Sequence, residues 1–180
     1  MGLALLGPPV SAGVSQRVEA NVEIERFDDI AQEFTDRVRE MIWCNVATVD
    51  RQQRPFSRIL HPLWEGKTGW ILTHRHSLKA KHLERNPFVS LSYIRGDVQR
   101  PLYVDCKATW VADGDERQRI WNLAMSQPPP LGFDPSPDFE SPENPNFGVL
   151  KLAPWRIVLV TFPAESYEAG LRVWRDASVT

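Results

Sequence analysis

Lys79 lies in a segment whose residue order favours binding of an anion. The segment runs from Ser77 to Val89, and Ser77 suits the N-cap of a short helix that Pro87 prevents from continuing. The N-terminus of such a helix presents free backbone N–H groups and a partial positive charge, and Lys79 belongs to its first turn. The spacing therefore predicts a phosphate-binding position at the start of this helix.

Arg58 is a lone cation on one face of the predicted strand Pro55–Trp64, a face that it shares with Leu60 and Pro62. A guanidinium among apolar neighbours requires an anion, and its planar fork matches two oxygens of a phosphate. The alternative interpretation is a salt bridge at the end of the strand. If Arg58 and Lys79 come together in the fold, the chain holds a phosphorylated cofactor.

The sequence offers little for metal or nucleophilic chemistry. His74 and His76 share a face if they lie on a strand, but no third ligand stands at a suitable spacing, so we expect no metal site. The sequence contains neither a glycine-rich phosphate loop nor a nucleophile elbow. Cys44 and Cys106 fall in apolar runs, which favours buried thiols in a reducing cytoplasm over a disulfide.

The composition is that of an ordinary globular domain. The chain has 180 residues, of which 42% are hydrophobic and 24% charged, and its net charge is −2. This balance gives no general attraction to nucleic acids or to an anionic membrane surface. We expect residues 1–20 to form a flexible arm, whose apolar run is too short for a secretory signal or a membrane span. Residues 21–180 are expected to form a single domain.

The pattern of apolar residues predicts a mainly β fold. Every second residue is apolar over Leu102–Ala112, and apolar residues at helical spacing predict helices over Phe27–Ile42 and Asp113–Ala124. About seven antiparallel strands in a chain of this length favour a small closed barrel. The other expected strands are Cys44–Val49, Pro55–Trp64, Trp70–Thr73, Phe88–Ile94, Gly148–Phe162 and Leu171–Trp174.

A proline-rich loop interrupts this pattern at residues 126–145. Its seven prolines predict neither a helix nor a central strand. Phe133 and Phe139 indicate that the loop is ordered. Because loops of this length are uncommon within a compact domain, we expect it to serve as a lid or a subunit contact.

Four further segments follow an apolar strand and a polar turn in a definite order: Arg58–Leu63, Ile71–Thr73, Ser77–Lys79 and Asn86–Leu91. Together they resemble the flavin-binding split barrel of the pyridoxamine 5′-phosphate oxidase family. The resemblance is close over residues 42–93 and looser over residues 107–174. It implies an antiparallel split β-barrel with flanking helices that binds flavin mononucleotide (FMN).

The resemblance also implies an assembly and a set of binding residues. It implies a homodimer with the cofactor at the subunit interface. Arg58 and Lys79 would hold the flavin phosphate, and Ser77 would cap the same site. Two segments would line the flavin ring and its ribityl chain, and these contribute Ile59, Leu60, His61, Leu72 and Thr73.

Two departures distinguish the chain from the true oxidase. Where the oxidase carries an Arg-x-His pair near its C-terminus, this chain has Arg172 followed by Trp174. Pro101 stands where a glutamine usually contacts the flavin. We therefore expect an uncharacterised relative that transfers hydride to or from an unknown small substrate, with a nicotinamide donor as a reductant.

Two alternatives keep this fold and change the function. A deazaflavin-dependent reductase would bind a cofactor with a longer anionic tail, for which Arg75, Lys81 and Arg85 are available cations. A non-catalytic module would hold a cofactor such as haem, with a histidine from residues 61–76 as the axial ligand. The cofactor and its chemistry distinguish the three hypotheses, because the fold does not.

Overall fold

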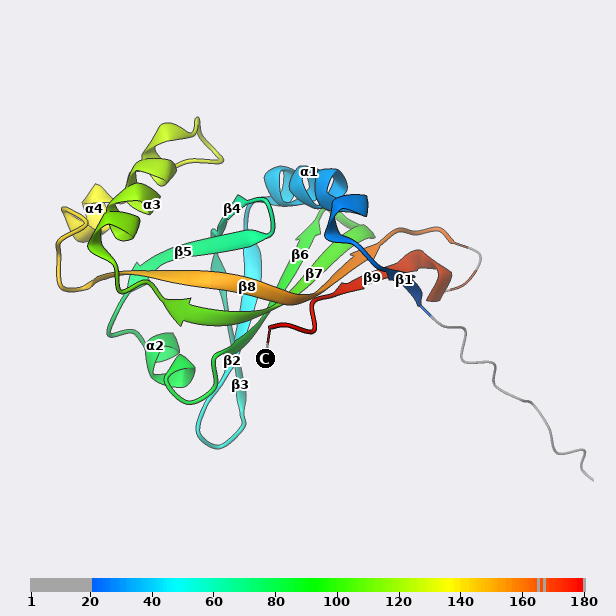
Figure 1. The fold of residues 1–180 in the computed structure, drawn as a ribbon, viewed down its shortest axis with the longest axis horizontal. Helices are drawn as coiled ribbons and strands as arrows, with labels where there is room; N and C mark the ends of the chain where they lie inside the picture. The colour runs from blue at the N-terminus through cyan, green and yellow to red at the C-terminus, as the bar shows by residue number, and fades with distance from the viewer. Residues whose placement is uncertain (1–20, 165, 167, 180) are drawn as a thin grey trace, which may run out of the picture.

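Figure 1 shows the computed structural model of the chain, which describes residues 21–164, 166 and 168–179. The expected flexible arm, residues 1–20, lies outside the described residues. No helix in the described part of the chain is long and apolar enough to cross a membrane.

Within these residues the chain forms nine strands, four α-helices and two 3₁₀ turns. The mainly β character expected from the sequence is confirmed. In chain order the elements are β1 (Val22–Ile24), η1 (Phe27–Asp29), α1 (Ala31–Met41), β2 (Cys44–Val49), β3 (Pro55–Leu60), β4 (Leu63–Glu65), β5 (Thr68–His74), α2 (Leu78–Leu83), β6 (Phe88–Arg95), β7 (Asp97–Trp110), α3 (Gly114–Ser126), α4 (Ser136–Phe139), β8 (Phe147–Val160), η2 (Glu168–Gly170) and β9 (Leu171–Arg175).

The strands form one curled sheet whose main path is β1-β9-β8-β7-β6-β2-β3. The long strand β8 pairs with β7 along one side and with β5 and β9 along the other, and β5 also pairs with β4. All pairs are antiparallel except β1 with β9, which is parallel. In the described sheet no ladder joins β3 to β5, so the barrel is split between these two strands.

The interior of the barrel is filled by the alternating apolar residues that the sequence predicted. On β7, Leu102, Val104 and Cys106 are fully buried, and Cys44 on β2 belongs to the same cluster. Both cysteines are free and buried, so their interpretation as core residues is confirmed. The sheet thus provides a packed frame from which the edge strand β3 projects.

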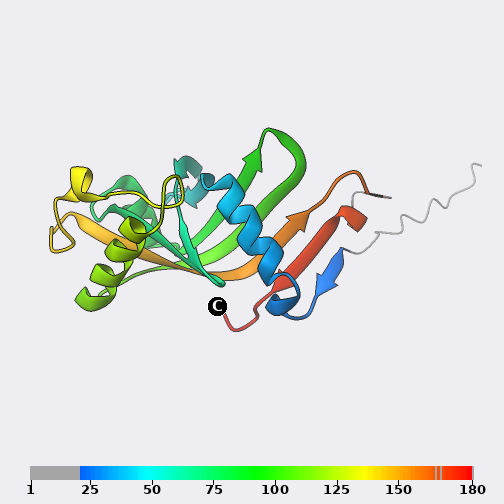
Figure 2. The ribbon, with the colours of Figure 1, turned by 90° about the horizontal axis from the view of Figure 1, so that it is seen from above.

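Helix α1 packs on this core beside the upper ends of β6 and β7 (Figures 1 and 2) through Ile30, Phe34 and Val38. The predicted helix over residues 27–42 is confirmed, although its first three residues form the 3₁₀ turn η1. Arg37, on the same helix, is also buried, with only 1% of its surface exposed. Its guanidinium ties α1 to the ends of β7 and β8.

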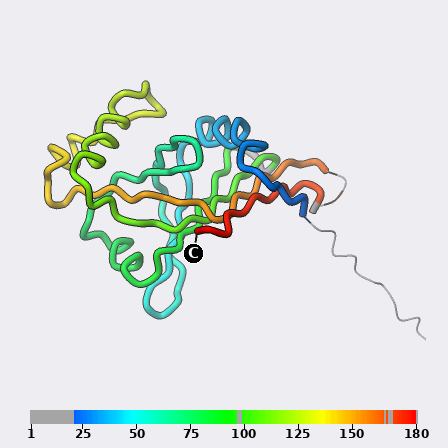
Figure 3. Tube along the Cα trace, viewed as in Figure 1, coloured from blue at the N-terminus to red at the C-terminus, as the bar shows by residue number. Residues whose placement is uncertain are grey.

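A second apolar cluster lies on the outer face of β5 and β8. Trp121 from α3 and Phe139 from α4 pack against Phe147 of β8. The trace in Figure 3 shows α3, the proline-rich loop and α4 together at the end of the molecule opposite β1 and β9. The expectation that the loop is ordered agrees with Phe139 being buried.

The prediction of no helix in the loop was wrong for the four residues of α4. Pro135 stands at its N-cap and Pro137 lies in its first turn, where the missing N–H has no intrahelical partner to lose. A single turn of helix is therefore compatible with the prolines that would end a longer one.

Two other elements differ from the sequence predictions. The predicted strand Pro55–Trp64 is divided into β3 and β4 by His61 and Pro62. Pro62 has no N–H for a ladder hydrogen bond, which accounts for the break. A hairpin turn therefore joins β4 to β5, at Gly66 with a φ of 57°.

Helix α2 has only six residues, so its N-terminus carries little of the charge expected from a long helix.

Candidate cofactor site and adjoining pocket

Arg58 lies on β3 and points across β2. One of its terminal nitrogens donates to the Thr48 hydroxyl at 2.7 Å and to the Val46 carbonyl at 3.2 Å. The Thr48 hydroxyl also lies 2.9 Å from the His82 ring of α2. These contacts fix the guanidinium between β3 and α2 and leave its second terminal nitrogen for a further acceptor. The alternative for Arg58 was a salt bridge, but no described carboxylate pairs with it.

Lys79 of α2 lies close enough to Arg58 for the two charges to repel each other. Burial lowers the pKa of the Lys79 ammonium, and the charge of Arg58 lowers this pKa further. Burial also lowers the pKa of the Arg58 guanidinium. Within the described ranges neither side chain forms an ion pair with a carboxylate. Two half-buried cations lie side by side with no described anion between them. Because the two charges repel each other, this arrangement favours the binding of an anion.

Ser77 occupies the N-cap position of α2 with extended backbone angles, as predicted, but its side chain makes no capping hydrogen bond. Its hydroxyl oxygen is buried and has no hydrogen-bond partner among the described residues. Buried hydroxyls are normally paired, because an unpaired one costs free energy. The hydroxyl precedes Lys79 by two residues, so it is available to an oxygen of the same ligand.

The five residues predicted to line the flavin ring do not all lie on one surface. Ile59 and Leu60 are neighbours on β3, so they point to opposite faces: Ile59 is 62% exposed, whereas Leu60 packs on the barrel core. Leu72 packs in the second apolar cluster, and Thr73 is buried. Of the five, Ile59 is exposed, Leu60, His61 and Leu72 are half-buried, and Thr73 is buried. His61 also lines the pocket described below.

His61 is held in an aromatic sandwich where the chain leaves β3. Its ring lies 5.0 Å from the ring of Trp43 and 5.0 Å from the ring of Phe133, measured between centroids. Burial lowers the pKa of the imidazole, and a hydrogen bond to the Leu131 backbone acts in the opposite direction. Burial has the larger effect, so the pKa of His61 is lowered overall and the neutral ring is favoured. The sequence analysis did not predict that Trp43 and Phe133 contact His61, because the three residues lie far apart in the sequence.

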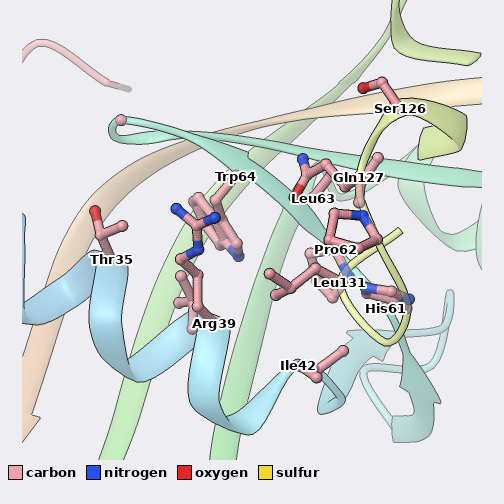
Figure 4. Close-up of a pocket in the computed structure, with 13 residues that line it drawn as sticks. Thr35, Arg39, Ile42, His61, Pro62, Leu63, Trp64, Ser126, Gln127 and Leu131 are labelled. Atoms are coloured by element: carbon pink, nitrogen blue, oxygen red, sulfur yellow. The ribbon is translucent and has the colours of Figure 1, made fainter. Parts of the chain in front are cut away.

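A pocket of about 230 Å³ adjoins His61 (Figure 4). Thr35 and Arg39 of α1 and Ile42, which follows that helix, line it from one side, and Leu131 and His61 line it from the opposite side. Arg39 brings a cation that makes no ion pair within the described part of the chain. The pocket thus combines apolar side chains with the polar side chains of Thr35, Ser126 and Gln127, one cation and one imidazole. This mixture suits a small molecule that is partly anionic.

Two other histidines, His74 and His82, lie against aromatic rings. His74 lies 4.6 Å from the ring of Phe139, and His82 is buried against Thr48 and the ring of Phe56. In residues 21–164, 166 and 168–179, no three side chains of metal-binding type come together. The pair His74 and His76 therefore has no third ligand nearby in the described structure.

The fold and these residues agree with a comparison with known proteins. A family model for pyridoxamine 5′-phosphate oxidase matches residues 17–161. The chain belongs to this family. Within it, the pyridoxine/pyridoxamine 5′-phosphate oxidase of Haemophilus influenzae (strain 86-028NP) is 34% identical over 73 residues, which make up 40% of this chain. The matched stretch spans only 35% of that oxidase, so family membership does not carry over its activity.

Solved structures share the architecture. An FMN-binding protein related to pyridoxamine 5′-phosphate oxidase from Nostoc punctiforme has a TM-score of 0.57 and 17% identity, with coverage of 76% of this chain and 86% of that one. The haem storage protein HutZ of Vibrio cholerae has a TM-score of 0.55 and 22% identity, with coverage of 69% and 89%. At these identities the likeness shows the fold, and the predicted split barrel is confirmed.

Proposed function

We propose that this member of the pyridoxamine 5′-phosphate oxidase family binds FMN and transfers hydride to or from a small organic molecule. The observation that carries the proposal is the group formed by Arg58, Lys79 and the buried, unpartnered hydroxyl of Ser77. A phosphate dianion would relieve the repulsion between the two cations and would give the hydroxyl an acceptor. The residues present therefore fit the phosphate of FMN.

The chain's own residues would each have a definite task. Thr48 holds the Arg58 guanidinium in place through a hydrogen bond of 2.7 Å, so little side-chain freedom is lost when a phosphate binds. Ile59, exposed on β3, would cover one side of the ring, with His61 at the entrance of the adjoining pocket. Arg39 would orient an anionic substrate in that pocket. FMN, when bound, supplies a ring that accepts or donates hydride.

Flavin titration of three variants tests the phosphate site. Arg58→Ala and Lys79→Ala should each weaken FMN binding by about 1.5–3 kcal/mol, the usual loss for a hydrogen bond to a charged group. Ser77→Ala should weaken FMN binding while leaving the stability of the ligand-free protein unchanged, because the hydroxyl makes no hydrogen bond within the described protein. Lys81→Ala is the matched control, since Lys81 lies on another side of α2. Unchanged FMN affinity in the Arg58→Ala, Lys79→Ala double variant would refute the proposal.

The proposal includes a homodimer with β3 at the interface. β3 is an edge strand in the described sheet, and three large apolar side chains near it are exposed: Ile59 (62%), Trp43 (56%) and Phe88 (43%). On the outer face, Ala47 of β2 lies opposite small serines of β3 and β6, and Ala47, Phe88 and Ser90 line a shallow, mainly apolar hollow. A face with exposed apolar residues suits a second copy. Sedimentation should give a dimer, and Ile59→Glu should yield monomers that lose FMN.

Turnover distinguishes the enzyme from a non-catalytic cofactor carrier. The FMN-loaded protein should be reduced by a nicotinamide donor and reoxidised by a substrate that enters the pocket beside His61. A protein that retains FMN but accepts no electrons from NADH or NADPH would be a binding module instead. The proposal places the protein in the cytoplasm, and the free, buried thiols of Cys44 and Cys106 support a reducing compartment.

A further inference from the structure

The pocket at His61 (Figure 4) contains a single permanent cation, and this limits the charge of its ligand. Arg39 is exposed on α1 and pairs with no described carboxylate. Among the described residues, no carboxylate and no other permanent cation lines the pocket. One guanidinium matches the single charge and the two oxygens of a carboxylate, whereas a phosphate dianion favours two cations, such as Arg58 and Lys79.

The hydroxyl groups that line the pocket have already used their hydrogens. Thr35 donates to the Ala31 carbonyl at 2.8 Å, and Ser126 donates to the Leu123 carbonyl at 3.0 Å. Because a hydroxyl carries a single hydrogen, each oxygen offers only lone pairs to a ligand. The Gln127 amide forms no hydrogen bond with a described residue, so it can both donate and accept.

His61 also offers a lone pair. Its ring bonds the Leu131 backbone, and this bond acts to raise the pKa of the imidazole. A carbonyl acceptor has that effect because it favours the ring N–H, and the Leu131 N–H already donates to the Pro128 carbonyl. The ring N–H of His61 therefore donates to the Leu131 carbonyl. Since burial favours the neutral ring, the second ring nitrogen is an acceptor without a described partner.

One wall of the pocket is an aromatic ring whose position is fixed. The Trp64 indole N–H donates to the Tyr93 hydroxyl at 2.8 Å, and the ring lies against Gly69, where a Cβ would come within 2.9 Å of it. The indole therefore offers a ligand only its flat apolar surface. The pocket volume of about 230 Å³ exceeds that of an engineered cavity of about 150 Å³ that holds benzene, so a ring with small substituents fits.

We propose that this pocket binds a planar, conjugated monocarboxylate that carries a hydroxyl or amino group away from the carboxylate. Arg39 would hold the carboxylate on the α1 side of the pocket. The second ring nitrogen of His61, on the opposite side, would accept the hydrogen of the hydroxyl or amino group. The inference rests on the proposed function for one point, the role of this ligand as the substrate that exchanges hydride.

Calorimetric titration of the full-length protein saturated with FMN tests the inference, since FMN then keeps other phosphates from the site at Arg58. The probes are benzoate, meta- and para-hydroxybenzoate, their methoxy counterparts and phenyl phosphate. At least one hydroxybenzoate should bind about fivefold more tightly than benzoate, the usual gain from one hydrogen bond. Its methoxy counterpart, which has no hydrogen to donate, should lose this gain. Phenyl phosphate should bind no more tightly than benzoate.

Two variants separate the two contacts. Arg39→Met should weaken every carboxylate probe by about tenfold or more, the usual loss for a hydrogen bond to a charged group. His61→Phe keeps a ring between Trp43 and Phe133, and it should remove only the preference for the hydroxybenzoate over benzoate. Arg51→Met is the matched control and should change no affinity, because Arg51 is also exposed but lies on the turn between β2 and β3, outside the pocket.

Four results would overturn the inference while the proposed function stands. Two concern the probes: no carboxylate binds the FMN-loaded protein, or phenyl phosphate binds at least tenfold more tightly than benzoate. Two concern the contacts: Arg39→Met binds the carboxylates as wild type does, or the hydroxybenzoates show no preference that His61→Phe removes. A protein that takes up no FMN would overturn the proposed function instead, and the carboxylate titrations of the FMN-free protein and of Arg39→Met would still decide the inference.

Discussion

Replacing Arg37 with methionine tests how the wall of the His61 pocket is held in place. Arg37 belongs to α1, the helix that contributes Thr35 and Arg39 to that pocket. Its guanidinium donates to the backbone carbonyls of Val160 at 2.6 Å and Pro101 at 3.0 Å, and more distantly to that of Arg100. Methionine has a similar length and fits an apolar surrounding, so the change removes hydrogen bonds with little loss of volume.

The expected cost follows from the acceptors that the change leaves behind. Glu33 keeps a partner, because Arg172 lies 2.7 Å from both of its carboxylate oxygens. Thr161 is exposed and can bond to water. The carbonyls of Pro101 and Val160 lose a buried donor, at about 1–3 kcal/mol each. Relief from burying the guanidinium offsets part of this loss. We therefore expect Arg37→Met to lower the free energy of unfolding by about 3 kcal/mol.

Urea denaturation followed by tryptophan fluorescence measures this difference. With a slope of about 2 kcal/mol per molar urea, the midpoint should fall by about 1.5 M. Arg39→Met is the matched control: it makes the same chemical change two residues along the same helix, at an exposed position without an ion pair, and should alter stability by less than about 0.5 kcal/mol. If the two variants were equally stable, the reasoning that Arg37 pins α1 would be refuted.

Two further predictions concern pH. Glu33 is partly buried, which acts to raise its pKa, but hydrogen bonds and charge from Arg172 and Arg37 outweigh burial and hold this pKa below its ordinary value of 4.5. Its stabilising contribution is therefore complete above pH 4.5 and lost as the pH falls through the lowered pKa, so the stability difference between wild type and Glu33→Gln should shrink over that window in acid-unfolding curves. For His61, burial lowers the pKa below 6.5, so protonation disfavours the folded state below that pH. An NMR titration should place its pKa below 6.5, and Phe133→Ala should raise it; an unchanged value would contradict the role assigned to burial.

The sequence predicted the elements better than the site that they build. The regular alternation of Leu102, Val104 and Cys106 predicted β7 correctly, because one face of a strand meets the core wherever the strand lies. The family resemblance identified Arg58 and Lys79, which the fold brings close together. Their closeness reflects the packing of α2 against β2 and β3, where Thr48 contacts both Arg58 and His82, and no local pattern encodes such a contact.

The parts that sequence reasoning missed depend on contacts between distant segments. A hollow between α2 and the turn from β2 to β3 joins Arg51 to Arg85, and the pocket of Figure 4 joins Thr35 to Leu131. The break at Pro62 was missed because the apolar pattern continues across it, although the absent N–H was a usable signal. These features follow from tertiary arrangement, and the separation of their residues hides them from any short window.

The separate apolar cluster beneath α3 and α4 has a consequence for how ligands exchange. Part of this cluster comes from β4, β5 and β8, and part comes from α3 and α4. Since the cluster is distinct from the barrel core, α3, the proline-rich loop and α4 can open as a cooperative unit while the barrel strands stay folded. Such an opening would carry Phe133 away from His61 and Leu131 away from the pocket wall, and so uncover the pocket. A ligand would then enter and leave the pocket at a rate set by the local unfolding of α3, the proline-rich loop and α4. Amide hydrogen exchange should be faster in α3 than in β7, and a bound pocket ligand should slow it in α3 first.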